Sequence, residues 1–400
     1  MPFEFSKLWF EPRRSSLRHW MFQVHKWAGV GVGLYLAMMG LTGSMSVFLP
    51  ELRNTLVSPI HVALGQQGMS LQALQTSIET NHPAFHLRAV YPGQSATWAD
   101  TFEEQAEDKT IREIVINPYT AQVLADRRRG TTLYDRARDL HANLLSGKTG
   151  KAINGFGGIL LLLTGLTGLV IWWSGRRHLK ANTFRVATHK GWHRLSFDLH
   201  RLVGVLVILP LSVAAITGVS LAFPQVAASA VSVVLGPRNE LLRAKSGKVD
   251  DARHITASLD AVLQTAIRQV PGAIPTRIQA PDGKYGGYLV WMHLPNDWRD
   301  EGDNRVLIDG SSARLLDVQI GRDMAPSSRV IEAATAIHYG QYGGISTRIF
   351  AVLTSLTLPL FFITGITLWW RRVFRQRPRP MVQTVSSVTL ADDVYAVETQ

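Results

Sequence analysis

Histidine is the residue type in this sequence that is best placed to do chemistry. The chain has thirteen histidines and no cysteine, which excludes disulfides, iron–sulfur clusters, cysteine-ligated zinc and covalent c-type haem attachment. Four histidines recur at matched positions in the two halves of the chain: His25, His141, His200 and His338. Because neutral imidazoles are common metal ligands, these four are the candidate metal-ligating residues.

Thr-Gly pairs accompany these histidines at equal offsets in the two halves. One pair comes seventeen residues after His25, and another seventeen residues after His200. A further pair comes twenty-six residues after His141 and again after His338. The four pairs are Thr42-Gly43, Thr217-Gly218, Thr167-Gly168 and Thr364-Gly365. This repetition of order and spacing predicts two copies of one unit, an internal two-fold repeat.

Four apolar segments are long enough to cross a bilayer as helices, which takes about 20 residues. They are residues 27–49, 153–173, 202–224 and 347–370. His25 and His200 stand before the first and third segments, and His141 and His338 precede the second and fourth. The first segment is expected to be an uncleaved anchor, because no small-residue cleavage site follows it. The sequence therefore predicts a bundle of four transmembrane helices.

Basic residues flank these helices on one side of the membrane. Residues 1–26 hold five Lys or Arg against two acids, and residues 174–201 hold seven against one. The long segments 51–152 and 225–346 are balanced in charge. Since basic flanks stay in the cytoplasm, we expect both termini (the tail being 371–400) and the middle loop to be cytoplasmic. The net charge of +12 is thus a topology signal and does not indicate nucleic-acid binding.

Each long outer segment has the pattern of a small α+β module, at residues 50–140 and 225–337. Helical apolar spacing predicts one helix in each, at 70–80 and 257–269. Strand-like runs follow at 86–91, 111–117, 274–279, 286–293 and 304–308, each set closed by a turn and a short strand. Short interfacial segments, 141–152 and 338–346, then lead into the second and fourth membrane helices.

The order helix, α/β module, helix, present twice, resembles the PepSY-associated transmembrane family. The stretch INPYTAQVL at residues 116–124 resembles the closing hairpin of a PepSY module. The resemblance implies a bacterial inner-membrane protein with two periplasmic PepSY-like modules. Members of this family include inner-membrane reductases that carry b-type haem and release iron from ferric siderophores.

The expected topology places the four histidines in two layers. His25 and His200 would lie near the cytoplasmic face, and His141 and His338 near the periplasmic face. Two facing neutral imidazoles are a suitable axial set for a haem held between bundle helices. We therefore expect two haem b groups per chain, one in each layer, with all four histidines as axial ligands.

Other residues near these layers have two interpretations each. The basic-segment histidines His19, His189 and His193 could replace a cytoplasmic ligand, or they are solvated. The threonines of the Thr-Gly pairs are expected to bond to helix carbonyls or to haem edges. Small faces of the first and third helices would admit a haem or a neighbouring backbone; they are formed by Gly29, Gly33, Gly40, Gly43, Gly204 and Gly218.

Two groups outside the membrane are candidates for binding an anion or a ligand. Arg127, Arg128 and Arg129 could steer an anionic ligand or bind haem propionates, or form a solvated charge run. Four aromatic residues could dock a ligand or pack the cores of the modules: Tyr119, Trp291, Trp298 and Tyr342.

The four histidines and the topology thus predict a haem oxidoreductase that passes electrons from a cytoplasmic or quinol donor across the membrane, and the family resemblance implies that the periplasmic acceptor is a ferric siderophore. No nucleophile–base arrangement is present, so no catalytic acid–base residue is assigned. The alternative is a non-enzymatic membrane protein whose PepSY modules bind peptides or regulate a protease. A transporter is a third possibility, but the helices lack paired acids and the repeat is parallel rather than inverted.

Overall fold

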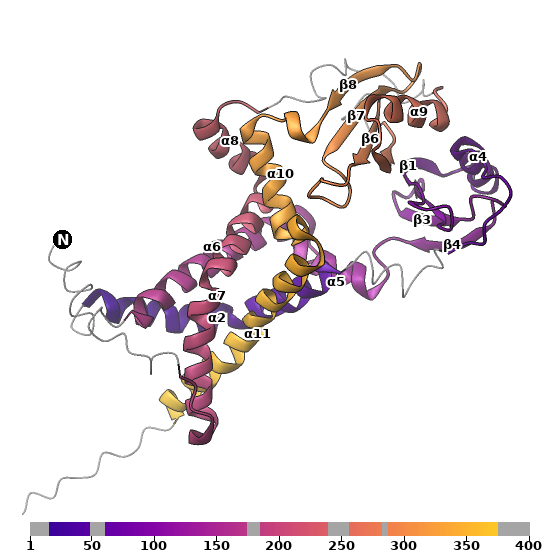
Figure 1. The fold of residues 1–400 in the computed structure, drawn as a ribbon. Coiled ribbons are helices and arrows are strands. Elements are labelled where there is room, and N and C mark those ends of the chain that lie inside the picture. The colour runs from indigo at the N-terminus through magenta and orange to yellow at the C-terminus, as the bar shows by residue number, and fades with distance from the viewer. Residues whose placement is uncertain (1–15, 49–60, 174–184, 239–255, 282–286, 375–400) are drawn as a thin grey trace, which may run out of the picture.

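The computed structural model describes residues 16–48, 61–173, 185–238, 256–281 and 287–374. Four long apolar helices form one end of the molecule, and a β-sheet with two short helices forms the other (Figure 1). The long helices are α2 (Ser16–Val47), α6 (Gly147–Trp172), α7 (Gly191–Ala222) and α11 (Gly344–Phe374). All four are long and apolar enough to cross a membrane.

All four of these helices begin earlier than the apolar segments predict. Helix α2 begins eleven residues before residue 27, and α7 begins eleven residues before residue 202. As a result His25 and His200 lie inside continuous helices rather than at their starts. The physical reason is that hydropathy detects only the part of a helix suited to hydrocarbon, whereas backbone hydrogen bonding continues through a polar first turn.

Two short helices connect the sheet to the bundle and carry the other two histidines. Helix α5 (Leu133–Asn143) contains His141, and α10 (Pro326–His338) ends at His338. A left-handed turn at Leu144 and Leu145 separates α5 from α6. Gly340 and Gly344, also with positive φ, separate α10 from α11.

A further short helix, α8 (Pro224–Leu235), was not expected from the sequence. Pro224 was read as the end of the third membrane helix, and it instead occupies the first turn of α8. Proline is favoured there because the first turn of a helix leaves its N–H groups unbonded anyway. Helices α8 and α10 pack together beside the bundle (Figure 1).

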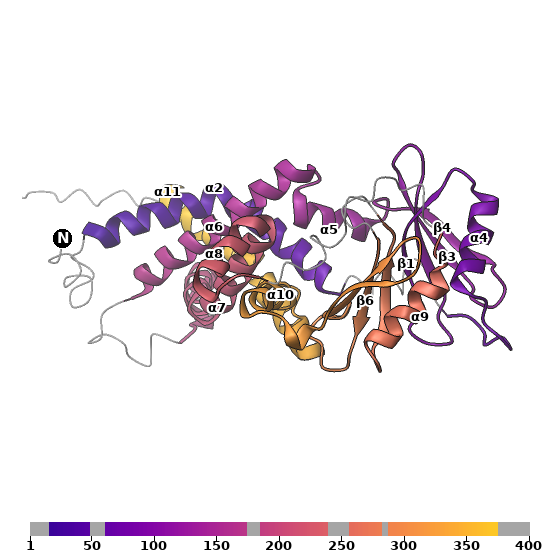
Figure 2. The same ribbon diagram turned by 90° about the horizontal axis from the view of Figure 1, so that it is seen from above.

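The strands form one antiparallel sheet of eight strands in the order β4-β3-β2-β1-β5-β6-β7-β8. Helices α4 (Leu71–Asn81) and α9 (Leu259–Gln269) cover one face, and their apolar sides share a core with that face (Figure 2). The strands are β1 (His86–Tyr91), β2 (Asp100–Gln105), β3 (Ile111–Ile116), β4 (Val123–Arg128), β5 (Ile274–Gln279), β6 (Gly287–His293), β7 (Asn304–Asp309) and β8 (Leu315–Gln319).

The two predicted modules are therefore not separate bodies. Strand β1 pairs with β5 through Ala89–Gln279 and Val90–Ile278, which joins the two four-stranded halves into one sheet. The sequence patterns of the two halves do not reveal this pairing, because both β1 and β5 look like strands in their own modules.

Strand β2 was missed because its sequence, DTFEEQ, has a single large apolar residue. Phe102 is fully buried in the core, while Glu103 and Glu104 are also buried, on alternate faces. Pairing with β1 on one side and β3 on the other imposes the strand conformation despite the acidic sequence.

Parts of the sequence predictions fall outside the described residues. These are residues 1–15 of the N-terminal segment, 49–60 between the first membrane segment and the first module, 174–184 of the basic loop, 239–255 and 282–286 of the second module, and 375–400 of the tail.

Candidate metal centres

The four repeated histidines come together as two pairs, one at each end of the bundle. The ring centroids of His25 on α2 and His200 on α7 are 6.1 Å apart. Those of His141 on α5 and His338 on α10 are 6.2 Å apart. Each pair takes one histidine from each half of the chain, as the sequence predicted. We call His25 and His200 the distal pair and His141 and His338 the proximal pair, according to their position relative to the sheet.

The distal pair is held by Thr-Gly residues of the second and fourth long helices. Nδ1 of His25 lies 2.9 Å from the Thr164 carbonyl oxygen and 3.2 Å from Thr167 Oγ1. Nδ1 of His200 lies 2.9 Å from Thr364 Oγ1. The adjacent Gly168 and Gly365 leave space for the imidazole rings, because a side chain there would meet Cε1 of the histidine.

The proximal pair is held in the same way by the first and third long helices. Nδ1 of His141 lies 3.1 Å from the Met39 carbonyl oxygen and 3.4 Å from Thr42 Oγ1. Nδ1 of His338 lies 3.1 Å from the Ala214 carbonyl oxygen and 3.0 Å from Thr217 Oγ1. Gly43 and Gly218 again give the rings room to approach the helix. Each of the four Thr-Gly pairs thus contacts the imidazole of one of the four histidines. We call such a Thr-Gly pair the seat of that histidine.

These contacts define which nitrogen of each imidazole carries the proton. Each threonine donates its hydroxyl hydrogen to the carbonyl one turn earlier, at 2.8 Å for Thr42, 3.0 Å for Thr167, 2.8 Å for Thr217 and 2.7 Å for Thr364. The threonine oxygen is then left as an acceptor, and the backbone carbonyls can only accept. Nδ1 is therefore the donor in His25, His141 and His338, each of which contacts a carbonyl oxygen, and the lone pair is left on Nε2.

Nε2 is the nitrogen that is free to bind a metal. Among the described residues, none forms a hydrogen bond with Nε2 of any of the four histidines. An N–H on the second ring nitrogen that is fixed by a carbonyl or another acceptor is the usual support of a metal-ligating histidine, since it sets the tautomer and the ring orientation.

Burial also keeps the proximal imidazoles neutral. It lowers the pKa of His141 below its usual value of 6.5, against a smaller raising effect of the Met39 carbonyl. Burial, together with the neighbouring His141, lowers the pKa of His338 to about 4. Both rings are neutral at physiological pH, which is the protonation state that a metal ligand requires.

The residues present fit a haem with two axial imidazoles. Two imidazoles on one metal ion, at bonds of about 2.0–2.1 Å each, have ring centroids roughly 6 Å apart, close to both observed separations. No cluster of three or more His, Asp or Glu suited to a metal occurs in the described ranges, so each pair offers two protein ligands. Haem needs no more than two from the protein, because its macrocycle supplies the others.

Open glycines flank both pairs at matched positions. Gly29 and Gly204 each come four residues after a distal histidine, and a side chain added at either would meet nothing within 4 Å. Gly147 and Gly344 each come six residues after a proximal histidine and are equally open. Because residues four apart share a helix face, a flat group bound at the distal pair would find Gly29 and Gly204 beside it.

The two pairs are separated by most of the thickness of a membrane. His25 and Thr42, the seat of His141, are seventeen residues apart on α2, and the same offset separates His200 from Thr217 on α7. At 1.5 Å per residue this is about 25 Å along each helix. The hydrocarbon core of a bilayer is about 30 Å thick, so this separation is most of that thickness.

The other histidines of the basic segments do not join the distal pair. His19 is exposed and lies 3.4 Å from Gln23 on its own helix. His189 is exposed in the turn before α7, and His193 has no ring contact with His25 or His200. The seats formed by Thr167 and Thr364 therefore select His25 and His200.

Some predicted small and basic residues have structural roles. A side chain at Gly33 would meet the ring of Phe362 at 2.9 Å, and one at Gly40 would meet the backbone of α11 at Ser355. These glycines thus allow α2 and α11 to pack closely. Arg127 pairs with Glu113, and Arg129 lies 2.8 Å from Glu103, so two members of the arginine run are neutralised within the sheet.

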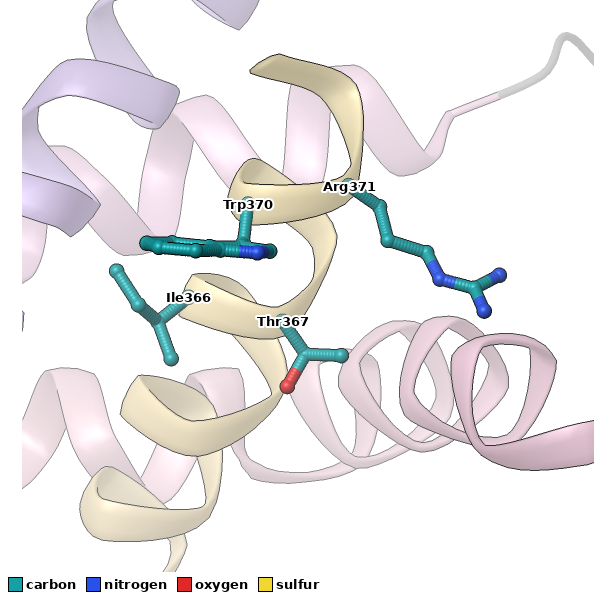
Figure 3. Close-up of a pocket in the computed structure, with 4 residues that line it drawn as sticks. All are labelled: Ile366, Thr367, Trp370 and Arg371. Carbon is teal, nitrogen blue, oxygen red and sulfur yellow. The ribbon is translucent and has the colours of Figure 1, made fainter. Parts of the chain in front are cut away.

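The predicted docking aromatics differ in exposure. Tyr119 packs in a small cluster and donates its hydroxyl to the Ala96 carbonyl at 2.6 Å. Trp291 is buried, whereas Trp298 and Tyr342 are exposed. A shallow pocket occurs elsewhere, at the end of α11 away from the sheet (Figure 3). The described residues that line it all belong to α11, and none is one of the paired histidines or a Thr-Gly residue that contacts them: Ile366, Thr367, Trp370 and Arg371.

Sequence reasoning found the histidines and the Thr-Gly pairs but not the contact between them. The available signal was that each Thr-Gly pair repeats at a fixed offset from the histidines. That offset indicated the repeat. For the threonine hydroxyls the sequence allowed two possible partners, helix carbonyls or haem edges. The carbonyl bonds are confirmed, and the imidazole is the additional partner.

Fold and histidine pairs together define a class: a multi-pass membrane protein with four apolar helices and an antiparallel α+β region outside them. The model of the PepSY-associated TM region family matches residues 22–372. The chain belongs to this family, as the sequence resemblance predicted. Comparison with curated proteins gives no significant match.

Proposed function

We propose that this protein is a haem-containing inner-membrane oxidoreductase that passes electrons across the membrane and reduces a ferric siderophore in the periplasm, releasing iron as Fe(II). One observation carries the proposal. Two histidine pairs lie at opposite ends of the bundle, and every histidine has Nδ1 fixed by a Thr-Gly seat and Nε2 free.

The chain's own residues would hold the cofactor and set its environment. His25 and His200 would be the axial ligands of one haem b, and His141 and His338 those of a second. The threonines and carbonyls that accept from Nδ1–H would orient the rings and raise their basicity as ligands. Bound haem would supply one-electron redox chemistry at each end of the bundle. No acid–base residue is required for that transfer.

The direction of transfer follows from the charge distribution. The basic flanks at 1–26 and 174–201 adjoin the distal pair, and basic flanks favour the cytoplasmic side. In this topology both termini are cytoplasmic, the distal pair receives electrons from a cytoplasmic or quinol donor, and the proximal pair and the sheet face the periplasm. The strand order is symmetric about the β1–β5 junction, and each histidine pair takes one residue from each half of the chain. We interpret both features as the result of two copies of one unit.

Family resemblance suggests the substrate. Siderophores hold Fe(III) with hard oxygen donors, which suit Fe(II) less well, so one electron loosens the complex. The sheet is linked to both helices that carry the proximal histidines: Arg127 lies over Tyr134 of α5, and Arg305 pairs with Glu332 of α10. A chelate bound at the sheet would therefore be near the proximal pair.

An absorption spectrum of the detergent-purified protein, oxidised and then reduced with dithionite, tests the proposal. Sharp b-type bands with about two haems per chain are expected from two bis-histidine sites. Reoxidation of the reduced protein by a ferric siderophore would then establish the reaction. Well-folded protein from haem-replete cells that shows no Soret band would overturn the proposal.

The second candidate is a non-enzymatic protein whose sheet binds peptides or regulates a protease. Its support is that β4 and β8 end the sheet, each with one edge that no other described strand pairs. Such an edge can accept an added strand. This function needs no cofactor, so retention of a peptide partner by protein whose four histidines are replaced would favour it.

A further inference from the structure

We propose that the face of the sheet turned toward the bundle is a docking site for an anionic chelate, in which Arg277 binds a carboxylate or catecholate oxygen of the ligand. This inference rests on the proposed function and specifies its substrate class. It begins from the two faces of the sheet, which differ in chemistry.

One face is apolar and covered. Val90, Ile278, Val290 and Val306 point into the core formed with α4 and α9. Residues one position away on the same strands lie on the opposite face. That face bears a row of directly paired residues across β5, β6 and β7, namely Arg277, Trp291 and Arg305.

The opposite face is turned toward the helices that carry the proximal histidines. At one side Arg305 lies 2.8 Å from Glu332 of α10, six residues before His338. At the other side the guanidinium of Arg127 lies 5.6 Å from the ring centre of Tyr134, seven residues before His141 on α5. Six to seven helical residues correspond to about 10 Å.

Almost every arginine of this face that the structure describes is matched by a carboxylate. Arg129 pairs with Glu103 at 2.8 Å, and Arg127 pairs with Glu113. Arg299 and Arg305 share Glu332, at 2.6 and 2.8 Å. The charge of these side chains is therefore largely satisfied within the fold.

Arg277 is the exception. Its guanidinium lies between two aromatic rings, 4.8 Å from the centre of Trp291 and 5.6 Å from that of Tyr91. Within the described part of the chain it has no ion-pair partner, and its Nε is buried without a hydrogen-bond partner. A buried Nε–H without an acceptor is costly, and the other guanidinium donors of this half-buried side chain are free to bind a ligand.

The charge and shape of Arg277 specify what it would accept. A guanidinium presents a planar fork of donors that matches the paired oxygens of a carboxylate or a catecholate. The rings of Tyr91 and Trp291 fix that fork in place. Ferric complexes of catecholates and carboxylates carry net negative charge, whereas a ferric trihydroxamate is neutral. The site therefore favours an anionic chelate over a neutral one.

Gallium complexes test this independently of electron transfer, because Ga(III) has the coordination chemistry of Fe(III) and is not reduced. The full-length, haem-loaded protein in detergent would be dialysed against the Ga(III) complex of a tris-catecholate and, separately, of a neutral tris-hydroxamate. We expect the tris-catecholate complex to bind at least tenfold more tightly. In Arg277→Gln that preference should fall about tenfold to a hundredfold, the range for loss of a charge-assisted hydrogen-bond pair.

Matched variants separate the ligand site from folding and from the cofactor. Arg322→Gln removes an equally charged but exposed side chain and should leave the preference unchanged. Arg277→Lys keeps the charge without the fork and should give an intermediate value, even if Arg277→Gln folds poorly.

Three results would overturn the inference. The first is equal binding of the two complexes by the wild type, and the second is an unchanged preference in Arg277→Gln. The third is a loss of haem in Arg277→Gln without loss of preference, because a haem propionate would then be the partner of Arg277. Retained gallium binding without any reduction of the ferric complex would instead contradict the proposed function and leave the docking site standing.

Discussion

The two histidine pairs make the same kinds of hydrogen bonds but are carried by different kinds of helix. The distal histidines, His25 and His200, lie within helices of 32 residues that continue on both sides of them. The proximal histidines lie at or near the ends of α5 and α10, helices of 11 and 13 residues that begin at the sheet side. The geometry of the distal pair is therefore set by the bundle alone, and that of the proximal pair by the bundle and the sheet together.

This difference implies that ligand binding at the sheet can influence the proximal pair and not the distal pair. Contacts from the sheet reach α5 through Arg127 and Tyr134, and they reach α10 through Arg299, Arg305 and Glu332. No comparable contact between the sheet and the distal pair occurs in the part of the chain that is described. Four predictions test this contrast between the pairs.

Replacing one ligand should have the largest effect. His200→Ala is expected to remove the distal haem and His338→Ala the proximal haem, each leaving about half of the haem per chain, because each metal loses an axial ligand from one pair only. Haem quantification and reduced-minus-oxidised spectra measure this. His189→Ala is the control and should keep both haems. Full haem content in either ligand variant would refute the pairing.

Adding a methyl group at the glycine of a seat should lower haem occupancy less than removing a ligand does. The size of the effect should depend on how close the imidazole lies to that glycine. A Cβ at Gly43 would lie 2.8 Å from Cε1 of His141, and one at Gly218 would lie 3.0 Å from Cε1 of His338. Gly43→Ala and Gly218→Ala should therefore displace the proximal rings and lower proximal haem occupancy several-fold. At Gly365 the distance to His200 is 3.6 Å, an ordinary contact, so Gly365→Ala is the matched control.

The haem spectra of these glycine variants show whether the added methyl group acts by displacing the imidazole ring. Equal loss of haem in Gly365→Ala and Gly43→Ala would show that the helices tolerate no added methyl group at all. The Thr-Gly contacts would then not be specific to the imidazoles.

Loosening α10 from the sheet should affect the proximal pair alone. Burial by itself would raise the pKa of Glu332, but Arg305 and Arg299 outweigh it and hold that pKa below its usual value. Glu332→Gln breaks both ion pairs at a cost of about 1–3 kcal/mol, less than for a fully buried pair. We expect a shifted midpoint potential for the proximal haem and an unchanged one for the distal haem. A redox titration that shows equal shifts would contradict the contrast.

A change on the covered face of the sheet should alter stability without altering either pair. Burial raises the pKa of Glu104 to about 8, with smaller effects of Gln75 and Glu79. Between the ordinary value of 4.5 and about 8, the folded state binds a proton that the unfolded state releases. Stability contributed by this group therefore falls as pH rises through that window.

Glu104→Gln removes this penalty, since the amide stays neutral at every pH. It should raise the thermal midpoint at pH 8 by a few degrees, on the order of 1 kcal/mol, and change it little at pH 5. Haem spectra should match the wild type at both pH values. A lower midpoint at pH 8 would show that the carboxylate is stabilised by a partner.

The sequence predicted most of the bundle and missed parts of the sheet for identifiable reasons. Apolar length identified all four membrane helices, although polar first turns hid the true starts of α2 and α7. Strand β2 was missed because Glu103 and Glu104 are buried by strand pairing, which no local pattern records. The joining of the modules through β1 and β5 depends on a contact between residues 190 positions apart, Ala89 and Gln279.

The sequence by itself determined which residues repeat: four histidines, four Thr-Gly pairs and the apolar helices that carry them. It also determined the family and, through charge, the expected topology. Only the tertiary structure decided that each Thr-Gly pair is the seat of a histidine from another helix, and that Nδ1 is the bonded nitrogen. The physical reason is that spacing along a chain fixes which residues share a face of one helix, whereas contacts between helices depend on how all four pack together.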